Sequence, residues 1–227
     1  MNVAIIAAAG HGTRMASKRP KQFLELAGVP IIIHTLKAFE QCEAINEIIM
    51  VLSAEEVPGF LALADKYDSK KIGAVVAGGA TRAASVLHGL QAAEGKSPEL
   101  VAVHDGARPF VTPDEISRTI EAARLEGAAI LVSAPVDTIK EVRDGNVVRT
   151  IKRGDLRNAL TPQCFRYTLL RQAYDAVDVS DPDLTDESSL VERLGASIAV
   201  VEGSARNIKI TRPEDIVIAQ ALLKNLS

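Results

Sequence analysis

The sequence predicts an α/β fold built on a mostly parallel sheet, with helices covering both of its faces. Short apolar runs alternate with amphipathic stretches of helical period along nearly the whole chain. The first run, at residues 3–8, is apolar throughout, as expected for a strand that is buried on both faces. With 227 residues the chain can bury a self-sufficient core, so we expect one domain, residues 1–227, rather than two smaller ones.

The expected elements follow one another along the chain. The apolar runs predict strands at residues 3–8, 47–52, 72–77, 100–104, 129–134 and 197–201. The amphipathic stretches predict helices at residues 30–41, 55–66, 83–93, 113–125, 166–177, 187–194 and 213–223. Pro113 and Pro213 stand at the first position of their helices, where proline is favoured. Either Thr185 or Asp186 is expected to cap the helix that follows them.

Residues 138–153 interrupt this alternation. Two short β-prone runs flank Asp144-Gly145-Asn146, which is typical of a hairpin turn. The hairpin has too few apolar residues for a core of its own, and an isolated hairpin is marginally stable in water. It is therefore expected to pack either on its own domain or on a second copy of the chain, and its spacing favours neither.

Composition argues against several classes of partner. The net charge of −3, with cations gathered at particular loops, argues against general nucleic-acid binding. No apolar run approaches the length of a membrane span, and the N-terminus lacks the basic leader of a signal peptide, so no membrane partner is expected. Cys42 and Cys164 stand far apart without metal-site spacing, which indicates reduced thiols in a cytoplasmic protein.

The segment after the first strand is expected to bind an anion. It opens with Gly10 and Gly12, whose backbone N–H groups can approach a ligand closely. Four cations then follow without an acidic residue among them: Arg14, Lys18, Arg19 and Lys21. The spacing is not that of a P-loop, and Met15 stands where a dinucleotide-binding loop has its third glycine. A polyphosphate is the expected ligand, and a solvated surface turn is the less favoured alternative.

A second glycine turn follows the strand at residues 72–77. Gly78 and Gly79 precede Arg82 and Ser85, so that backbone amides here can contact a base or a ribose. A glycine pair before a helix is often only a turn, and by itself this signal is weak.

Asp105 stands at the end of another apolar strand, where one carboxylate is suited to Mg²⁺ together with substrate phosphates. Arg108 can hold a phosphate, and an ion pair between Asp105 and Arg108 is the alternative. His104 is expected to be a packed residue at the strand end. Lys209, from its sequence context alone, is expected to be an exposed lysine of a short strand.

The chain has no Ser-His-Asp order, nucleophile elbow or conspicuous Cys-His pair. The remaining mode of catalysis is positioning of the substrates with neutralisation of their charge. Phosphoryl or nucleotidyl transfer depends most on this mode.

Together these segments resemble the methylerythritol-phosphate cytidylyltransferases of the nonmevalonate isoprenoid pathway. The shared motifs occur in the order AAAGHGTRM with PKQF, GGATRAASV, HDGARPF, APVDTIK, ALTPQ, TDESS and NIKITRPED. The resemblance implies a Rossmann-like three-layer fold with a protruding β-arm, about residues 138–153, that forms a homodimer. It also implies transfer of CMP from CTP to 2-C-methyl-D-erythritol 4-phosphate, with release of pyrophosphate and help from Mg²⁺.

The resemblance assigns roles to particular residues. Arg14 and Lys21 would stabilise charge on the α-phosphate, while Lys209 and Arg153 would position the attacking phosphate. Contacts with CTP are implied for Ala8, Ala9, Gly10, Gly12, Gly79 and Ser85. Contacts with the polyol phosphate are implied for Asp105, Arg108, Thr138 and Thr161, with Asp105 also facing the metal. From the arm, Thr138 and Arg153 would reach the site of the other subunit, and Lys209 changes from a surface lysine to a site residue.

Three other functions are alternatives to this one. A ribitol-5-phosphate cytidylyltransferase belongs to a sister family with the same loop and arm. A nucleotidyltransferase for GTP or a sugar 1-phosphate is disfavoured by the arm and by NIKITRPED. A non-catalytic nucleotide-binding module would not need the full set of charged residues, which are Arg14, Lys21, Asp105, Arg153 and Lys209.

Overall fold

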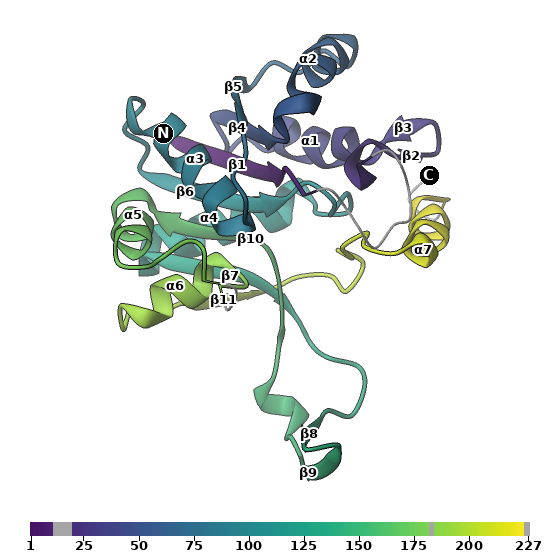
Figure 1. The fold of residues 1–227 in the computed structure, drawn as a ribbon, viewed down its shortest axis with the longest axis vertical. Coiled ribbons are helices and arrows are strands. Elements are labelled where there is room, and N and C mark those ends of the chain that lie inside the picture. The colour runs from purple at the N-terminus through teal and green to yellow at the C-terminus, as the bar shows by residue number, and fades with distance from the viewer. Residues whose placement is uncertain (11–19, 182–183, 225–227) are drawn as a thin grey trace.

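The computed structural model describes residues 1–10, 20–181 and 184–224, which form a seven-stranded sheet between two layers of helices (Figure 1). The strand order is β11-β7-β10-β6-β1-β4-β5. The strands are β1 (Asn2–Ala8), β4 (Glu47–Leu52), β5 (Ile72–Ala77), β6 (Leu100–Asp105), β7 (Ala128–Ser133), β10 (Asn158–Arg166) and β11 (Ala199–Glu202). Neighbouring strands are parallel except where β10 pairs with β6 and β7. The predicted mostly parallel α/β fold is confirmed.

Seven α-helices occur in the described ranges. They are α1 (Ile31–Gln41), α2 (Val57–Lys66), α3 (Arg82–Glu94), α4 (Pro113–Glu126), α5 (Tyr167–Asp175), α6 (Glu187–Arg193) and α7 (Pro213–Lys224). Short 3₁₀ turns are η2 (Lys21–Phe23), η3 (Ala54–Glu56) and η4 (Arg153–Asp155). None of the helices in this part of the chain is long and apolar enough to cross a membrane.

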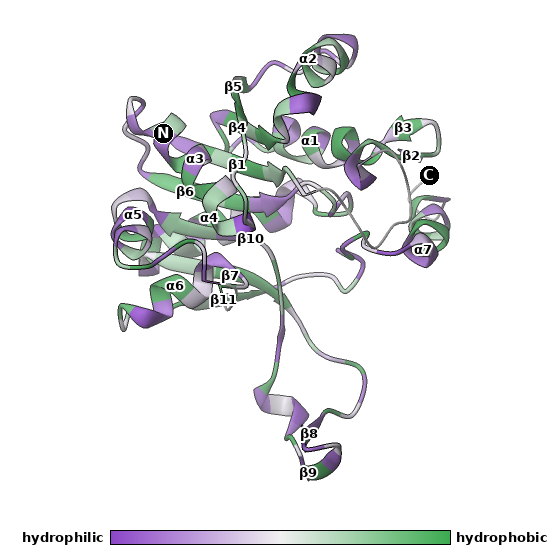
Figure 2. Ribbon diagram, viewed as in Figure 1, coloured by the Kyte–Doolittle hydropathy of each residue, from purple (hydrophilic) through white to green (hydrophobic). Residues whose placement is uncertain are grey.

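The sheet is apolar on both faces, which gives the three layers. Along β1, Ala4 and Ile6 lie in the cluster that holds side chains of α1, α2 and α4. The intervening Val3 and Ile5 lie in the cluster that holds side chains of α3, α5 and α6. Figure 2 shows the central strands as the hydrophobic part of the molecule. Because both faces are buried, these strands are continuous apolar runs in the sequence and could be predicted from it.

Side-chain caps start the helices where the sequence predicted them. Thr112 accepts a hydrogen bond from the backbone of Glu115, whose carboxylate accepts one from the backbone of Thr112, so α4 begins with a full capping box. Asp186 caps α6 by accepting from the backbone N–H of Ser189 at 3.0 Å. Of the two predicted caps for this helix, Asp186 is therefore the correct one.

The strand β10 is not predicted by the sequence pattern and adds an antiparallel member to the sheet. No strand was expected between the hairpin, which ends at residue 153, and residue 197, yet β10 is antiparallel and lies near the middle of the sheet. Pro162 concealed it, because proline is rare inside a central strand. The pairing with β7 shifts register between Ala159 and Gln163, around this proline. Because Arg166 ends β10, α5 starts at Tyr167, one residue later than predicted.

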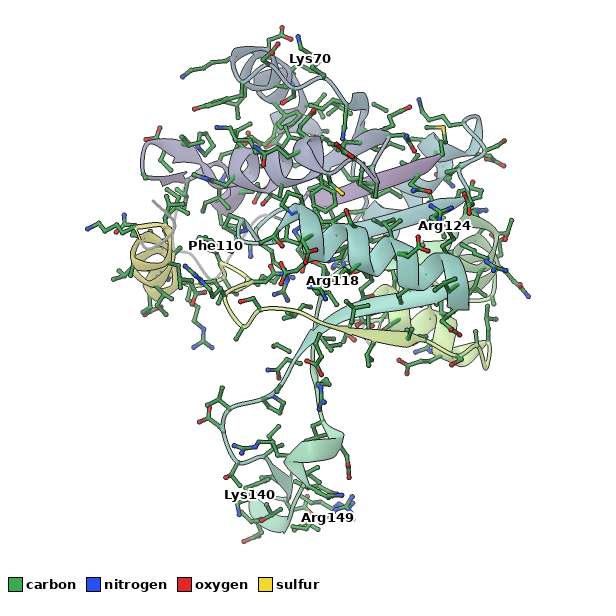
Figure 3. All side chains as sticks on the ribbon, turned by 180° about the vertical axis from the view of Figure 1, so that it is seen from behind. Lys70, Phe110, Arg118, Arg124, Lys140 and Arg149 are labelled. Atoms are coloured by element: carbon green, nitrogen blue, oxygen red, sulfur yellow. The ribbon has the colours of Figure 1, made fainter. Side chains whose placement is uncertain are left out.

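The predicted hairpin forms β8 (Lys140–Arg143) and β9 (Asn146–Thr150). Its turn places Asp144 at φ 50° and Gly145 at φ 77°, both left-handed, as a tight hairpin turn requires. The hairpin projects from the sheet, with Lys140 and Arg149 at the opposite end of the molecule from Lys70 (Figure 3). β9 is exposed along its whole length, so the hairpin does not fold onto its own domain.

A small third cluster fixes the C-terminal segment near the sheet edge. Leu26, from the hairpin of β2 (Glu25–Leu26) and β3 (Val29–Pro30), packs with Phe110, Ile210 and Ala219. Figure 3 shows Phe110 on the side of the molecule where α7 lies. The backbone N–H of Ile210 donates to the carbonyl of Ala107 at 2.9 Å. This contact brings the segment containing Lys209 beside the end of β6.

Candidate active site

A pocket of about 450 Å³ lies where β1, β5 and β6 end. The carboxyl ends of parallel strands meet at one edge of a sheet, which is where open α/β sheets bind ligands. The pocket walls come from residues 7–10, 21–22, 79–82 with Ser85, Asp105 with Ala107, and Lys209 with Thr211. The fold therefore gathers in one cavity the strand ends that the sequence analysis singled out separately.

The two glycine turns are in direct contact. A Cβ on Gly78 would lie 2.4 Å from the Cβ of Ala9, so only glycine allows the turns after β1 and β5 to approach this closely. Gly79 also lies against α3, since a Cβ there would stand 2.6 Å from the Cβ of Ala84. The predicted nucleotide contacts at Ala8, Ala9, Gly10, Gly79 and Ser85 thus border one space.

Ser85 uses its hydroxyl group to build the second turn. The side chain is 4% exposed, and its Oγ donates to the carbonyl of Thr81 at 2.8 Å and accepts from the N–H of Gly79 at 3.1 Å. Ser85 therefore holds Gly79 against the pocket, and its predicted contact with the nucleotide stays a prediction.

The 3₁₀ turn η2 carries two pocket residues. The ammonium of Lys21 donates to the carbonyl of Ile210 at 2.8 Å, and Lys21 lines the same pocket as the glycine turns. The side-chain amide of the buried Gln22 donates to the carbonyls of Ala8 and Gly10. Gln22 was not predicted as a site residue, although it belongs to the PKQF motif. It fixes the backbone that leaves β1, so that Lys21 and the first glycine turn keep their relative position.

Three cations converge on the carboxylate of Asp105. Its Oδ1 accepts from Nε of Arg82 at 3.1 Å, and its Oδ2 accepts from Nε of Arg108 at 3.3 Å and Nζ of Lys209 at 2.8 Å. Burial alone would raise the pKa of Asp105, but Arg82, Lys209 and Arg108 hold it well below its usual range. The carboxylate is therefore ionised at any physiological pH. The predicted ion pair between Asp105 and Arg108 is present, and Lys209 is a pocket residue rather than a surface lysine.

Arg82 is a site residue that the sequence analysis did not assign. Its guanidinium bridges two carboxylates, since Nη1 donates to Oε1 of Glu187 at 2.7 Å while Nε donates to Asp105. Burial alone would lower the pKa of Arg82, but Glu187 and Asp105 raise it further above its usual value. A cation directly after a glycine turn at a helix start was the available signal. The partner carboxylate could not be identified, because Glu187 had the simpler explanation of a helix start.

A buried chain of hydrogen bonds supports the backbone of Asp105 from the protein interior. The hydroxyl of Thr161 accepts from the backbone N–H of Asp105 at 3.2 Å and donates to Nδ1 of His104 at 3.0 Å. Nε2 of His104 then donates to the carbonyl of Arg108 at 3.2 Å. Burial lowers the pKa of His104 to about 3, so the ring is neutral, as this arrangement requires. The prediction that His104 is a packed residue is confirmed.

Some predicted site residues do not line the pocket. Thr161 is 4% exposed and contacts Asp105 from the protein side. Arg108 points its Nη1 at the carbonyl of Asn207, 2.8 Å away. Thr138 and Arg153 lie on the arm and are exposed. Gly12 and Arg14 fall outside the described residues. The ligand contacts predicted for all of these stay predictions.

The donors present fit a divalent cation only if a ligand brings phosphates with it. Asp105 is the one carboxylate among the pocket-lining residues that the structure describes, and these residues contain no group of three or more metal-ligating side chains. Its Oδ1 accepts a single hydrogen bond from the described part of the chain, which leaves room for one further contact. Mg²⁺ is commonly held by one or two carboxylates with the remaining ligands from water and substrate phosphates. Asp105 matches that requirement.

The pocket is therefore equipped to bind and orient a polyphosphate. Lys21, Arg82 and Lys209 supply positive charge at its walls, and the glycine turns supply backbone amides. Such a site accelerates a reaction by orientation and by stabilising developing negative charge.

Known proteins of one family match this chain over nearly its whole length. The profile of the 2-C-methyl-D-erythritol 4-phosphate cytidylyltransferase family matches residues 2–225. A protein of that name from Bacillus cytotoxicus is 46% identical over 223 residues, covering 98% of this chain and 98% of the relative. The crystal structure of 4-diphosphocytidyl-2C-methyl-D-erythritol synthase from Anaerococcus prevotii matches with a TM-score of 0.87 at 35% identity, covering 99% of this chain and 96% of that one. The cytidylyltransferase structure from Thermus thermophilus gives 0.78 at 37% identity, with 97% and 98% covered.

Proposed function

The chain belongs to the 2-C-methyl-D-erythritol 4-phosphate cytidylyltransferase family, and on that premise we propose that it transfers CMP from CTP to 2-C-methyl-D-erythritol 4-phosphate. Pyrophosphate is released, and the product serves isoprenoid precursor synthesis. The observation that carries the proposal is the convergence of Lys21, Lys209 and Asp105 on the pocket that the two glycine turns form.

The nucleotide occupies the part of the pocket bounded by the glycine turns. Backbone groups of Ala8, Ala9 and Gly10 surround the phosphates, while Gly79 and Ser85 lie where the base and ribose would be recognised. Lys21 faces this space from η2 and stabilises charge at the α-phosphate, a role that Arg14 is proposed to share.

The acceptor binds beside Asp105 and Lys209. An oxygen of its 4-phosphate attacks the α-phosphorus of CTP, the bond from that phosphorus to the β,γ-pyrophosphate breaks, and pyrophosphate leaves. The attacking phosphate is already ionised, so the reaction needs no general base. Both substrates are anionic and repel each other, and Lys209, with Arg153 of the arm, offsets this repulsion. In-line orientation by these contacts can lower the barrier by about 7–11 kcal/mol.

Mg²⁺ is proposed to enter with CTP, because Asp105 has room for one further contact at Oδ1 and the triphosphate supplies the remaining ligands. When bound, the ion would supply positive charge that offsets the negative charge of the phosphates. Arg82 and Arg108 fix the carboxylate of Asp105, and the hydroxyl of Thr161 fixes its backbone N–H group. The carboxylate is therefore held in place at the pocket.

The arm is proposed to form a homodimer. Three of its valines are widely exposed, namely Val142 at 57%, Val147 at 63% and Val148 at 50%, and Val136, just before the arm, is 79% exposed. Apolar side chains gathered on a projecting hairpin are expected to be covered by another surface. A second copy of the chain would cover these valines. In that dimer, Thr138 and Arg153 of each chain would reach the site of the other chain.

We place the enzyme in the cytoplasm, in keeping with two buried cysteines that remain free thiols.

Pyrophosphate release tests the proposed function. The purified chain is incubated with CTP, Mg²⁺ and either 2-C-methyl-D-erythritol 4-phosphate or ribitol 5-phosphate, and a control reaction contains no acceptor. We expect turnover with the methylerythritol phosphate and little without an acceptor. Exclusive turnover of ribitol 5-phosphate would assign the chain to the other substrate, and no turnover with either would reject cytidylyl transfer.

A further inference from the structure

Glu187 carries a negative charge that is almost completely buried. The residue is 1% exposed and is the first residue of α6. Its Oε1 accepts from Nη1 of Arg82 at 2.7 Å and from the hydroxyl of Tyr174 at 3.1 Å. Burial, and then Glu187 itself, raise the pKa of Tyr174, so this hydroxyl stays a donor. Glu187 does not line the pocket, but its ion-pair partner does.

Arg82 is held at two points of its rigid fork. Nε donates to Asp105 and Nη1 donates to Glu187, and these two carboxylates fix the plane of the guanidinium. The remaining nitrogen, Nη2, has no hydrogen-bond partner among the described residues. Arg82 lines the pocket at the start of α3, close to Gly79, so its guanidinium is within reach of a ligand bound there.

The backbone that carries Glu187 is itself fixed to the sheet. Gln163 of β10 is 1% exposed, and its side-chain amide donates to Oδ2 of Asp186 at 2.8 Å. Its carbonyl oxygen accepts from the backbone N–H of Ser188 at 2.9 Å. Gln163 thus holds the residues on both sides of Glu187, and the carboxylate is presented to Arg82 from a rigid element.

A purely structural role would explain part of this arrangement. An acidic residue in the first turn favours a helix, and an ion pair can join α3 to α6. Neither role requires Glu187 to be only 1% exposed. In addition, Oε2 of Glu187 is buried without a hydrogen-bond partner in the described part of the chain. A buried acceptor without a partner costs stability. The carboxylate therefore has a feature that stability alone does not favour.

Resting on the proposed function, we propose that Glu187 is a positioning residue of the nucleotide site. It orients Arg82 so that Nη2, which has no partner in the described part of the chain, meets the phosphates of CTP. Glu187 acts through Arg82 alone and does not touch the substrate.

Replacing Glu187 by glutamine tests this inference, since E187Q keeps the shape of the side chain and removes its charge. We expect KM for CTP, and the calorimetric Kd for CTP, to rise about tenfold or more, the scale of a lost hydrogen bond to a charged group. KM for the polyol phosphate should stay within about twofold, because Arg82 is proposed to contact only the nucleotide. Glu192→Gln is the matched control, since Glu192 is an exposed residue of the same helix and should leave both constants unchanged. A loss of stability alone would not raise KM for CTP while leaving KM for the polyol phosphate unchanged.

The double variant R82Q/E187Q keeps the test decisive if E187Q folds poorly. Removing both charges leaves no buried ion without a partner, so the double variant should be more stable to denaturant than E187Q. Its KM for CTP should equal that of R82Q, because Glu187 has no effect without Arg82. Three results would each overturn the proposal: a folded E187Q with the parent KM for CTP, an R82Q variant with that same KM, or additive effects in the double variant. An unmodified chain that releases no pyrophosphate would instead reject the proposed function.

Discussion

The ammonium of Lys209 lies 2.8 Å from Oδ2 of Asp105 at the edge of the pocket. The two residues reach this position from distant parts of the chain, because the contact between Ile210 and Ala107 ties the C-terminal segment to the end of β6. Lys209 is 37% exposed at its side chain, so it can contact a bound anion while Asp105 keeps it near the sheet edge. The pair therefore joins the proposed acceptor position to the proposed metal ligand.

Replacing Lys209 by alanine should impair the use of the acceptor. Without the cation, the attacking phosphate loses a preorganised contact, and we expect kcat/KM for the methylerythritol phosphate to fall by about 10²-fold. Initial rates at saturating CTP with varied acceptor measure this effect. Lys224→Ala, at an exposed lysine of α7, is the control and should keep the parent value. Equal values for K209A and the parent would remove Lys209 from the reaction.

Replacing Lys21 by alanine should act on the chemical step. Lys21 is proposed to meet charge that develops at the α-phosphate, so kcat should fall by about 10²–10³-fold. Single-turnover rates with bound CTP separate this effect from binding. Lys37→Ala, at an exposed lysine of α1, should turn over normally. An unchanged kcat in K21A would show that this cation takes no part in the transfer.

Replacing Gly78 by alanine should separate the two glycine turns. The added methyl group would stand 2.4 Å from the Cβ of Ala9, so the backbone on one side must move. We expect the free energy of unfolding to fall by about 1–3 kcal/mol and CTP binding to weaken about tenfold. Denaturant unfolding and calorimetry measure the two effects. Gly95→Ala provides the comparison, because a methyl group added there would meet nothing within 4 Å among the described residues and its φ is −66°. Normal CTP affinity in G78A would mean that the nucleotide does not use this junction.

The neutral state of His104 should make stability depend on pH. Burial lowers the pKa of His104 in the folded chain to about 3, against 6.5 for an ordinary histidine. Below pH 6.5 the unfolded chain binds a proton at this residue that the folded chain does not bind, so stability falls as the pH drops. Between about pH 7.5 and about pH 5 this linkage removes about 2 kcal/mol from the free energy of unfolding.

Urea unfolding across this pH range checks the histidine prediction. His104→Asn should reduce the dependence by that amount, whatever its effect on stability at neutral pH. His88→Asn, at an exposed histidine, should keep the dependence of the parent. Identical pH profiles for the parent and H104N would contradict a neutral, buried His104.

A charge on the arm should disrupt the proposed dimer. The parent is expected to have about twice the 24.2 kDa mass of one chain in light scattering. Val147→Asp places a charge on the exposed apolar surface of β9 and should give the mass of a single chain, with lower activity because Thr138 and Arg153 no longer reach a second site. Val217→Asp, at a valine of α7 that is 68% exposed, should remain dimeric. A monomeric parent with full activity would reject the role of the arm.

Much of the fold could be predicted because its strands are buried on both faces. Val3 and Ile5 face one helix layer while Ala4 and Ile6 face the other, so β1 is an unbroken apolar run. The opposite holds for β10, where Pro162 interrupts the pattern and the strand could not be recognised. Proline and glycine indicate where turns occur in the sequence, but they do not indicate the order of the strands in the sheet.

The site was predictable only where its residues follow strand ends. Asp105 and the glycine turns come directly after apolar runs, and parallel strands bring such ends together. The contacts of Arg82 with Glu187, and of Gln22 with the backbone of Ala8, join segments whose proximity depends on the whole fold. Lys209 was recognised through resemblance, since its own surroundings in the sequence favour an exposed lysine.

A crystal structure of the chain with CTP and Mg²⁺ tests the central claim most directly. It should show the triphosphate between Lys21 and the glycine turns, the base beside Gly79, and Mg²⁺ held by Asp105 together with the phosphates. A nucleotide bound elsewhere, with this pocket empty in crystals of a chain that turns over CTP, would contradict the account.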